Sequence, residues 1–282
     1  MTIHIKGKLN QLEKALPEGL LVDAAWLERE GYSRALRNQY VSAGWLEKPT
    51  RGVFRRPRGS VGWEQAVISL QTLLGHAVSV GGRTALDLQG YAHYLSPVQK
   101  TVHLYSDNKL PGWLHQLPLE LDFLTHNRRR LFPSRVLPSV KITLDKALLD
   151  EGKMLEQGLR ISNWGQWDWP LVLSTPERAY LELLDELPLN ETFHMADVMM
   201  EGMSSLSPRR LQFLLENVQS VKVKRLFFFF AQRHNHPWLK RIKKNKVDLG
   251  HGKRALVSSG KLDPEFLITI PKEFAQEVRN DL

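Results

Sequence analysis

Hydrophobic residues near the N-terminus recur at the three- and four-residue spacing of short amphipathic helices. The pattern predicts helices over residues 5–16, 23–30 and 33–43, with a short extended segment at 20–22. Asp23 and Ser33 stand at the starts of the second and third helix, where a short polar side chain accepts a hydrogen bond from a free backbone amide. Gly31 ends the second helix, because glycine takes the left-handed conformation at little steric cost. The second and third helices, joined by this turn, predict a helix-turn-helix.

The third predicted helix has an apolar side and a polar side. Leu36, Tyr40 and Ala43 share the apolar side at helical spacing. Arginine can bond a guanine edge through two hydrogen bonds, asparagine an adenine edge, and valine can meet a thymine methyl group. The opposite side is therefore expected to face DNA. Its predicted residues are Arg34, Arg37, Asn38 and Val41, together with Ser33 before them and Ser42 after them.

A basic hairpin is predicted directly after this helix. Residues 45–56 have apolar positions on both sides of a turn-forming tip at 48–52. From Ser33 to Arg58 there are seven basic residues and one acid, Glu47, which gives +6. A helix-turn-helix with a basic wing favours DNA as the partner, although arginine on a helix surface is often only solvated. The wing and linker residues expected on DNA are Lys48, Thr50, Arg51, Arg55, Arg56 and Arg58.

Residues 61–170 combine helical and strand patterns after a polar linker at 58–62. Helices are predicted over 63–74 and 83–89, and strands over 77–80, 101–105 and 119–124. The last two strands alternate apolar and polar residues, as half-buried strands do. Arg128, Arg129 and Arg130 are expected in a solvated loop that could touch phosphates. The tryptophans of 161–170 are expected to pack at a domain junction rather than to stack on bases.

From Ser174 onward the pattern is mainly helical. Helices are predicted from Thr175, over 195–201, from Ser207 and over 221–234. Four consecutive phenylalanines in the last of these are expected to fill a core. Residues 254–270 alternate like paired strands, with a turn at 258–260.

Positive charge is concentrated between Lys222 and Arg254. This stretch has eleven basic residues and one acid, Asp248, which gives +10 in a chain with a total of +9. Such a concentration indicates a second polyanion-binding surface. The residues predicted for it are Lys222, Lys224, Arg225, Arg233, Lys240, Arg241, Lys243, Lys244, Lys253 and Arg254.

Catalytic motifs are missing from the 282 residues. No P-loop, H-E-x-x-H or G-x-S-x-G motif is present, and no two aspartates stand at i and i+2 as in the paired-carboxylate site of a nucleotidyltransferase. The absence of cysteine excludes disulfides and thiolate catalysis. His234 and His236 have no evident third ligand, so a polar loop is expected there rather than a metal site. We expect neither catalysis nor a cofactor.

No membrane segment is predicted either. No apolar run reaches the roughly 18 residues of a membrane-spanning helix. Residues 1–19 lack the apolar stretch of a signal peptide. A cytoplasmic protein without a membrane partner is therefore expected.

Four stretches of the sequence resemble the AbiEi-type antitoxins of bacterial abortive-infection systems, which are type IV toxin–antitoxin systems. They are LLVDAAWLEREGYSRALRNQYVSAGWLEKPTRGVFRRP, STPERAYLELLDELP, SLSPRRLQFLLENVQSVKVKRLFFFFAQRHNHPWLKRI and DLGHGKRALVSSGKLDPEFLITIP. The two long C-terminal stretches are fairly specific, whereas the middle of the chain matches only loosely. The resemblance implies an N-terminal winged helix that represses the protein's own operon and a C-terminal region that counters a toxin.

In that family the toxin is a nucleotidyltransferase encoded beside the antitoxin and countered indirectly, without a stable complex. The absence of paired carboxylates fits the antitoxin and not the toxin. By this resemblance, operator DNA is read by Arg34, Arg37, Asn38, Lys48, Thr50 and Arg51. A C-terminal charged surface would involve Lys222, Lys224, Arg225, Lys240, Arg241, Lys243 and Lys244.

The sequence therefore predicts an α+β chain with three parts. Residues 1–60 form a winged helix-turn-helix domain, 61–170 a mixed α/β region, and 171–282 an antitoxin region, mainly helical with a terminal hairpin. Two other interpretations stay open. A ligand-sensing winged-helix regulator would need a pocket lined by the tryptophans near Trp164. A nucleic-acid-processing enzyme using the C-terminal basic surface would need a cluster of carboxylates with lysine.

Overall fold

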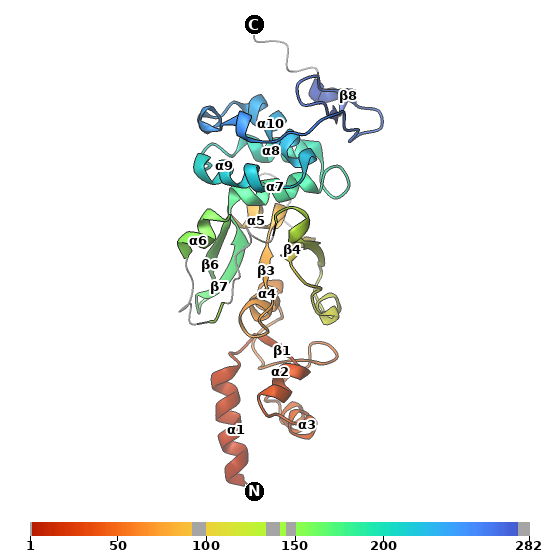
Figure 1. Cartoon of the computed structure of the whole chain (residues 1–282). Coiled ribbons are helices and arrows are strands. Elements are labelled where there is room, and N and C mark those ends of the chain that lie inside the picture. Colours follow the sequence, from red (N-terminus) through yellow and green to blue (C-terminus); the bar gives the residue numbers. More distant parts are fainter. Residues whose placement is uncertain (1, 92–99, 134–141, 145–150, 276–282) are drawn as a thin grey trace.

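The structure is a computed structural model that describes residues 2–91, 100–133, 142–144 and 151–275. Its fold is α+β, as the sequence predicts. The molecule is elongated, with helix α1 at one end and strand β8 at the other (Figure 1). A small helical part comes first, a five-stranded sheet lies in the middle, and a layer of helices follows.

The N-terminal part has five short elements. They are α1 (Thr2–Ala15), β1 (Leu21–Asp23), α2 (Ala24–Arg29), α3 (Arg34–Ser42) and β2 (Val53–Arg55). Asp23 Oδ1 accepts a hydrogen bond from Trp26 N, in the first turn of α2, at 2.7 Å, and Ser33 Oγ accepts one from Leu36 N of α3 at 3.3 Å. Both predicted N-caps are thus confirmed. Gly31, between the helices, has φ +83°, a value that other residues rarely adopt.

The predicted hairpin at 45–56 is shorter than expected. Glu47 forms an isolated antiparallel bridge with Arg55, and the loop 48–52 connects them. The regular partner of β2 is instead β1, the extended segment before α2. The predicted wing therefore pairs with the strand that leads into α2.

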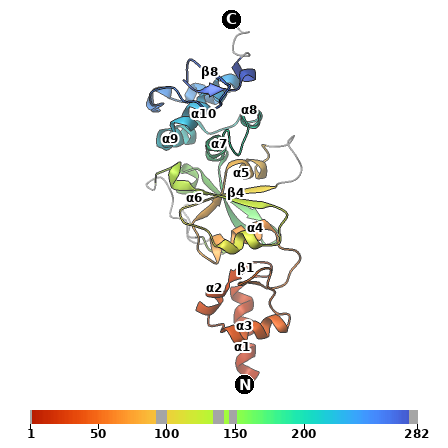
Figure 2. The same ribbon diagram turned by 90° about the vertical axis from the view of Figure 1, so that its right-hand side faces the viewer.

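The middle sheet is mixed, with strand order β5-β4-β3-β7-β6. Its strands are β3 (Val78–Val80), β4 (Thr101–Ser106), β5 (Asp122–Asn127), β6 (Leu159–Trp164) and β7 (Trp169–Ser174). The pairs β4–β5 and β3–β7 are parallel, and the other neighbours are antiparallel. Its helices are α4 (Trp63–Thr72), α5 (Gly82–Leu88) and α6 (Glu151–Glu156), with the 3₁₀ helices η1 (Gly112–Gln116) and η2 (Arg128–Arg130). Figure 2 shows α4 on the side of the N-terminal part and α5 on the side of the helical layer.

Two predicted strands differ from the observed ones. β5 begins at Asp122, three residues later than predicted. β4 is buried from Val102 to Ser106 rather than half-buried, because it lies inside the sheet between β3 and β5. Arg128 is not in a solvated loop either: its side chain is 4% exposed and forms a bidentate pair with Asp107.

The helical layer follows β7 directly. Its elements are α7 (Pro176–Asp185), α8 (Phe193–Glu201), α9 (Pro208–Asn217), α10 (Val221–His234), η4 (Pro237–Arg241), η5 (Lys244–Lys246), β8 (Lys261–Leu262), β9 (Thr269–Ile270) and η6 (Lys272–Ala275). Helix α10 is confirmed, and its four phenylalanines are all buried. The hairpin of β8 and β9 turns at 263–268, so the turn predicted at 258–260 only leads into it.

Gln71 of α4 connects strands β3 and β7 through hydrogen bonds to their backbones. β3 and β7 share a single register pair, Val80 with Leu173. The Gln71 amide donates to the carbonyl oxygens of Val78 and Val172 at 3.0 and 3.1 Å, and its Oε1 accepts from Val172 N at 3.0 Å. This side chain therefore takes the place of hydrogen bonds between the strands, because buried backbone groups need partners.

The same helix is packed against the N-terminal part. Ser69 Oγ accepts a hydrogen bond from Leu21 N at 2.8 Å in a buried position. One hydrophobic cluster continues from the N-terminal helices through the sheet to α10. The boundary predicted at 60 is thus crossed by buried contacts, and the boundary predicted at 170 lies inside β7. The division into three domains remains a prediction.

Replacing Gln71 by Met should lower the free energy of unfolding by about 2–4 kcal/mol. The methionine keeps the length of the side chain but leaves buried backbone groups of both strands without partners, each at about 1–3 kcal/mol. Urea or thermal unfolding followed by circular dichroism measures the change. The exposed Gln219 offers a matched control, and Gln219→Met should change stability by less than about 0.5 kcal/mol. Equal stability of the two variants would contradict the role given to Gln71.

Candidate nucleic-acid interfaces

Helix α3 presents a polar face to solvent. Its buried side packs inward through Tyr40, whose ring lies 6.3 Å from that of Tyr32. The exposed residues of the helix are Arg34, Ala35, Asn38, Gln39 and Ser42, with Ser33 exposed just before them. At about 100° per residue, the centre of the exposed face lies nearly a quarter turn around the helix axis from the centre of the predicted face. Gln39 was missed, although it lies next to Asn38 on the helix, and Val41 is half-buried.

The wing lies beside this face. Lys48 Nζ donates to Asn38 Oδ1 at 3.4 Å and lies 5.4 Å from the centre of the Phe54 ring. Lys48 and Arg51 are exposed, and Thr50 between them is half-buried. Neither cation has an ion pair among the described residues. The helix and the wing therefore present Arg34, Lys48 and Arg51 to solvent as unpaired charges.

Arg37 does not belong to the exposed face. It is 8% exposed, and its Nη1 donates to the carbonyl oxygen of Ala24 at 2.8 Å. Its guanidinium also lies 6.0 Å from the centre of the Phe54 ring. The expectation that the Arg37 side chain is exposed to DNA is thus wrong. It is buried and connects α3 to the start of α2 and to the wing strand.

Three further basic residues predicted for DNA contact are occupied within the fold. Arg55 is 6% exposed, pairs with Glu47 at 2.8 Å and donates to the carbonyl oxygen of Gly59 at 2.6 Å. The other two connect the linker to the end of α1 and to the segment after it. Arg56 bonds the carbonyl oxygens of Glu13 and Leu16 and pairs with Glu13 and Glu18, and Arg58 pairs with Glu18 and lies over the Trp167 ring. These cations hold the wing and linker in place.

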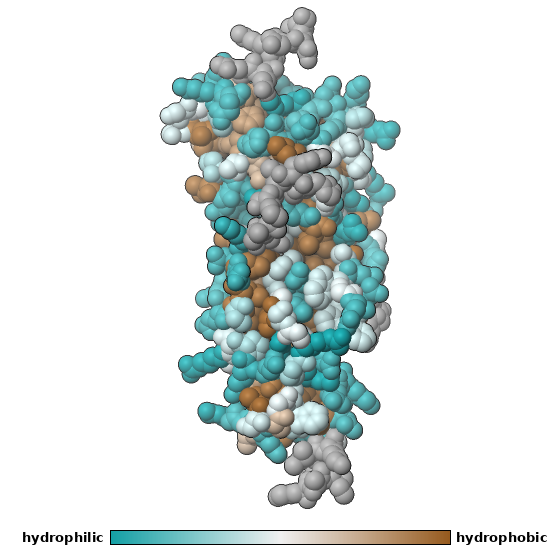
Figure 3. Space-filling model, turned by 180° about the vertical axis from the view of Figure 1, so that it is seen from behind, coloured by the Kyte–Doolittle hydropathy of each residue, from teal (hydrophilic) through white to brown (hydrophobic). Residues whose placement is uncertain are grey.

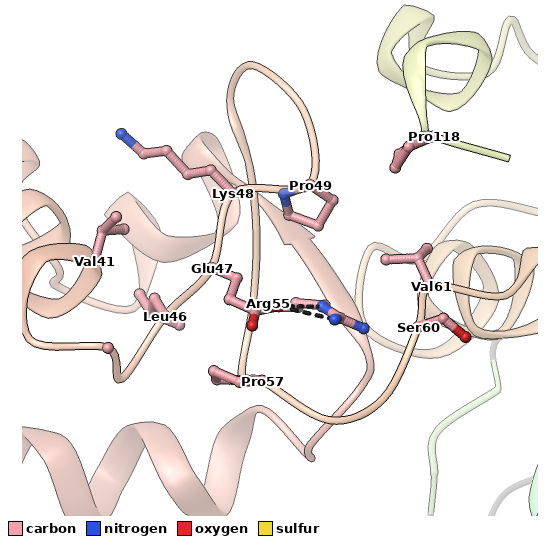
Figure 4. A pocket seen from close by; sticks show the side chains of 11 residues that line it. Val41, Leu46, Glu47, Lys48, Pro49, Arg55, Pro57, Ser60, Val61 and Pro118 are labelled. Carbon is pink, nitrogen blue, oxygen red and sulfur yellow. Dashed lines mark hydrogen bonds and ion pairs between the residues drawn. The ribbon is translucent and has the colours of Figure 1, made fainter.

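A pocket lies at the base of the wing, between the end of α3, the linker and the middle region (Figure 4). The pair Glu47–Arg55 points into it, and Pro118 closes the opposite side. The tryptophan cluster lies elsewhere. Trp164 stacks on Trp169 with ring centres 6.1 Å apart, across the β6–β7 pair, and Trp167 is exposed at the turn. Trp164 and Trp169 thus pack on each other, Trp167 does not share in this packing, and none of the three lines this pocket.

The C-terminal basic stretch is divided between interior and surface. Arg225 is 2% exposed and donates to the carbonyl oxygens of Leu249 and Gly252, each at 2.7 Å. Lys222 caps the carbonyls at the end of α7, and Lys224 is buried. The prediction of a solvent surface is wrong for Lys224 and Arg225, which are buried, whereas Lys222 is half-buried with its ammonium on carbonyl oxygens.

Two more basic residues of this stretch form ion pairs. Arg233 Nε lies 3.0 Å from Asp197, and Lys244 Nζ lies 2.5 Å from Glu265. Six of the eleven are left as exposed cations without an ion pair in the part of the chain that the structure describes. They are Lys240, Arg241, Lys243, Lys246, Lys253 and Arg254. Lys246 was not among the predicted site residues, although it belongs to the same run.

A chain of buried acids and imidazoles lies where the sheet meets the helical layer. His103 Nδ1 is 3.2 Å from His126 Nε2, and His126 Nδ1 is 3.1 Å from Glu186 Oε1. At the other end, His103 Nε2 is 3.9 Å from Glu191, which is also 3.9 Å from Arg83. Nothing in the sequence pattern indicated this cluster, since its members come from α5, β4, β5 and the loop after α7.

Burial shifts the protonation of this cluster. It raises the pKa of Glu191 to about 7, against the pull of Arg83. It raises the pKa of Asp87 to about 6. Burial and the neighbouring His126 lower the pKa of His103 to about 4. At neutral pH Glu191 is thus about half protonated and His103 is neutral.

Neither a metal site nor a membrane span is found in the described parts of the chain. No three side chains of His, Asp or Glu there lie close enough together to hold a metal ion. None of the described helices has both the length and the apolar character that crossing a membrane requires. His234 and His236 instead bond Asp197 and the carbonyl oxygen of Met200, respectively.

Two family models together match almost the whole chain. Residues 5–97 match a family model described as "Transcriptional regulator, AbiEi antitoxin N-terminal domain", and residues 99–271 match one described as "Transcriptional regulator, AbiEi antitoxin, Type IV TA system". No curated protein matches the sequence significantly. Among solved structures, the RV2827C protein from Mycobacterium tuberculosis is similar, with a TM-score of 0.55 and 14% identity over 92% of this chain and 88% of that one. At this identity the likeness shows the fold alone.

The pH dependence of stability should reveal the acid–imidazole cluster. The folded protein keeps a proton on Glu191 that the unfolded chain releases above pH 4.5, so stability falls as pH rises from about 4.5 to 7. His103 acts in the opposite sense: the unfolded chain takes up a proton below pH 6.5 and the folded one only near 4, so stability falls as pH falls through that window. Glu191→Gln should therefore raise stability at pH 8 by about 1–2 kcal/mol and leave it nearly unchanged at pH 4.5.

Melting temperatures measured between pH 4.5 and 8 give the result. The exposed Glu201, whose replacement by Gln removes the same charge, supplies the control and should show no such pH-dependent gain. A variant Glu191→Gln that is less stable than the wild type at pH 8 would contradict the assignment.

Proposed function

Since this chain belongs to the AbiEi family of transcriptional-regulator antitoxins of type IV toxin–antitoxin systems, we propose that it has two activities. It represses transcription of its own operon by binding operator DNA through the N-terminal helix-turn-helix and wing. It also counters a nucleotidyltransferase toxin, encoded beside it, through the C-terminal part of the chain. Both activities take place in the cytoplasm, and neither involves catalysis by this protein.

The observation that carries the DNA-binding proposal is the exposed face of α3 beside the wing. Arg34, Asn38 and Gln39 stand at positions from which long polar side chains reach base edges in a major groove. Lys48 and Arg51 extend from the wing next to them, where phosphates would follow. A helix that reads bases and a wing that holds the backbone are the two parts of a specific complex.

The internal arginines support this arrangement by fixing it. Arg37 joins α3 to α2 and to the wing strand, and Arg55 joins the wing to the linker. The distance between the recognition face and the wing is thus set before DNA binds. Less conformational entropy is lost on binding when the interface is already ordered.

The antitoxin activity is assigned to the exposed cations at the other end of the molecule. Lys240, Arg241, Lys243, Lys253 and Arg254 keep their charges free of ion pairs in the described structure. Removing them costs little stability, because exposed side chains away from caps and buried networks contribute little. In this proposal the toxin is countered functionally, without a stable complex of the two proteins.

Replacing Asn38 by Ala should weaken binding to the protein's own promoter by about 1–3 kcal/mol and relax preference at one base pair. Its amide is exposed on α3, so the loss comes from base contact and not from unfolding. Fluorescence anisotropy with promoter fragments that carry single base changes measures both effects. Arg29→Ala, an exposed change at the end of α2, is the control. An equal loss on promoter and random duplex would mean that Asn38 contacts only the backbone.

A double replacement of Lys48 and Arg51 by Ala should flatten the slope of log K against log salt concentration by about two, because two phosphate contacts are lost. Arg55→Ala should instead leave the slope unchanged and lower the melting temperature, since Arg55 is enclosed by Glu47 and backbone carbonyls. Salt titrations of the three proteins on one promoter fragment test this. The same slope for wild type and double variant would place the wing away from DNA.

A further inference from the structure

The cavity around the Glu47–Arg55 pair at the base of the wing has no part in the proposed function (Figure 4). We call it the wing-base pocket. Its volume is about 680 Å³, within the roughly 300–1,000 Å³ of small-molecule sites. Its walls come from the end of α3, both arms of the wing, the linker and, through Pro118, the middle region. Ligands often bind in cavities of this kind, between two parts of a chain.

Most of the lining is apolar and stiff. Val41, Leu46 and Val61 contribute branched side chains, and three prolines, among them Pro118, contribute rings. Proline has a fixed φ, so these walls change shape little. On the face that Figure 3 shows, the N-terminal end of the molecule is covered mainly by hydrophilic residues, so an apolar hollow is not a general property of this end. Apolar walls on several sides suit the flat body of an aromatic molecule.

One carboxylate oxygen of the lining has no hydrogen-bond donor among the described residues. Arg55 contacts only Oε2 of Glu47, through Nε and Nη2, each at 2.8 Å. Nη1 and Nη2 of Arg55 also donate to the carbonyl oxygens of Arg58 and Gly59, at 3.3 and 2.6 Å. The guanidinium, 6% exposed, is thus fixed on one side of the carboxylate. Glu47 Oε1 is left to accept a hydrogen bond from a ligand.

The charges of the lining favour a neutral ligand. Glu47 Oε1 repels an anion, and the Lys48 side chain points away from the pocket (Figure 4), with its ammonium on Asn38. A cation is disfavoured as well, because the lining has two bases, Lys48 and Arg55, against this one acid. A neutral molecule with an N–H or O–H group meets neither repulsion and supplies the donor that Glu47 Oε1 lacks.

A ligand in this pocket would restrict the wing loop. The base of the wing is fixed by the bridge between Glu47 and Arg55, and the loop 48–52 extends beyond it. Pro49 of this loop lines the pocket. A molecule packed against Pro49 therefore restricts the segment that carries Lys48 and Arg51. Less conformational entropy is then lost when the wing meets DNA, and ligand and DNA strengthen each other's binding by the same factor.

We propose that the wing-base pocket binds a neutral aromatic molecule whose N–H or O–H group donates to Glu47 Oε1, and that this ligand tightens the binding of operator DNA. The ligand is then a co-repressor. The part of the proposal that concerns DNA rests on the proposed function, whereas the part that concerns the ligand stands independently of it.

Four probes that share one ring system test the class of ligand. Indole is neutral and has one N–H donor, and 1-methylindole keeps the rings without the donor. Indole-3-acetate adds a negative charge and tryptamine a positive one. Each is titrated into the full-length protein, and the methyl NMR signals of Val41, Leu46 and Val61 locate the site. Indole should bind at least about tenfold more tightly than each of the other three, because a hydrogen bond to a charged group is a strong one.

Two matched variants test the role of Glu47. Glu47→Gln keeps an oxygen for Arg55 and replaces the free oxygen by an NH₂ group, so it should weaken indole binding at least about tenfold and leave 1-methylindole nearly unchanged. Glu18→Gln is the control. Glu18 pairs with Arg58 of the same linker and its side chain is 42% exposed, against 46% for Glu47, but it lies outside the pocket. This control should bind indole as the wild type does.

The effect on DNA is measured by fluorescence anisotropy on a promoter fragment, with and without saturating indole. Indole should tighten promoter binding at least threefold for the wild type and for Glu18→Gln, and not for Glu47→Gln. A promoter that the protein does not bind at all would overturn the proposed function and the DNA part of this proposal with it. The probe titrations would still decide the ligand part.

Three results would overturn the proposal. The first is indole that fails to bind, or that binds without shifting the methyl signals of Val41, Leu46 and Val61. The second is 1-methylindole or a charged probe bound as tightly as indole, which would leave Glu47 Oε1 without a role. The third is unchanged promoter affinity in saturating indole. Melting curves show whether both variants are folded, and the comparison of the four probes on the wild type needs no variant.

Discussion

A buried ion pair connects the sheet to the helical layer. Arg178 and Glu182 of α7 are fully buried and lie 2.8 Å apart. Glu182 accepts a hydrogen bond from Gly82 N at the start of α5, and Arg178 donates to the carbonyl oxygen of Gln157 beside β6. Removing one partner of such a pair leaves a buried charge without compensation, at about 3–5 kcal/mol. The position of α7 on the sheet is therefore fixed by charge as well as by packing, and α8 to α10 are built on α7.

The two candidate binding surfaces depend on that connection for their separation. At one end, Ser69 and Gln71 of α4 join the N-terminal part to the sheet. At the other end, α10 holds the C-terminal segment through Arg225. Polar side chains that bond backbone groups thus define the spacing between the two ends. The two charged surfaces are therefore kept at opposite ends of the molecule.

The basic residues have two roles, bonding within the fold and carrying charge at the surface, and net charge does not distinguish them. In both basic stretches, arginines with several donors turn inward: Arg37, Arg55 and Arg225 each donate to backbone carbonyl oxygens. Exposed basic residues near them, such as Lys48, Arg51 and Lys240, have no ion pair among the residues that the structure describes. The excess of positive charge therefore predicted a larger exposed surface in each region than the fold leaves. The buried cluster of Glu191, His103, His126 and Glu186 shows the opposite: here the fold brings titratable groups together although no excess of charge in the sequence indicated them.

Local chemistry in the sequence determined the helices and their ends. Asp23, Gly31 and Ser33 act through their nearest neighbours, so the helices α2 and α3 and the turn between them were predictable, as was the phenylalanine-rich helix α10. Strand pairing was less so, because β2 takes β1 as its partner across two intervening helices. Which face of α3 is exposed, and which arginines are free, only the tertiary structure decided. A guanidinium bonds the carbonyl or carboxylate groups that the folded chain brings to it, and such a partner can lie 55 residues away in sequence, as Leu155 does from Arg210. The sequence by itself fixes what each segment can form; which side chains remain available to a partner depends on contacts that exist only after folding.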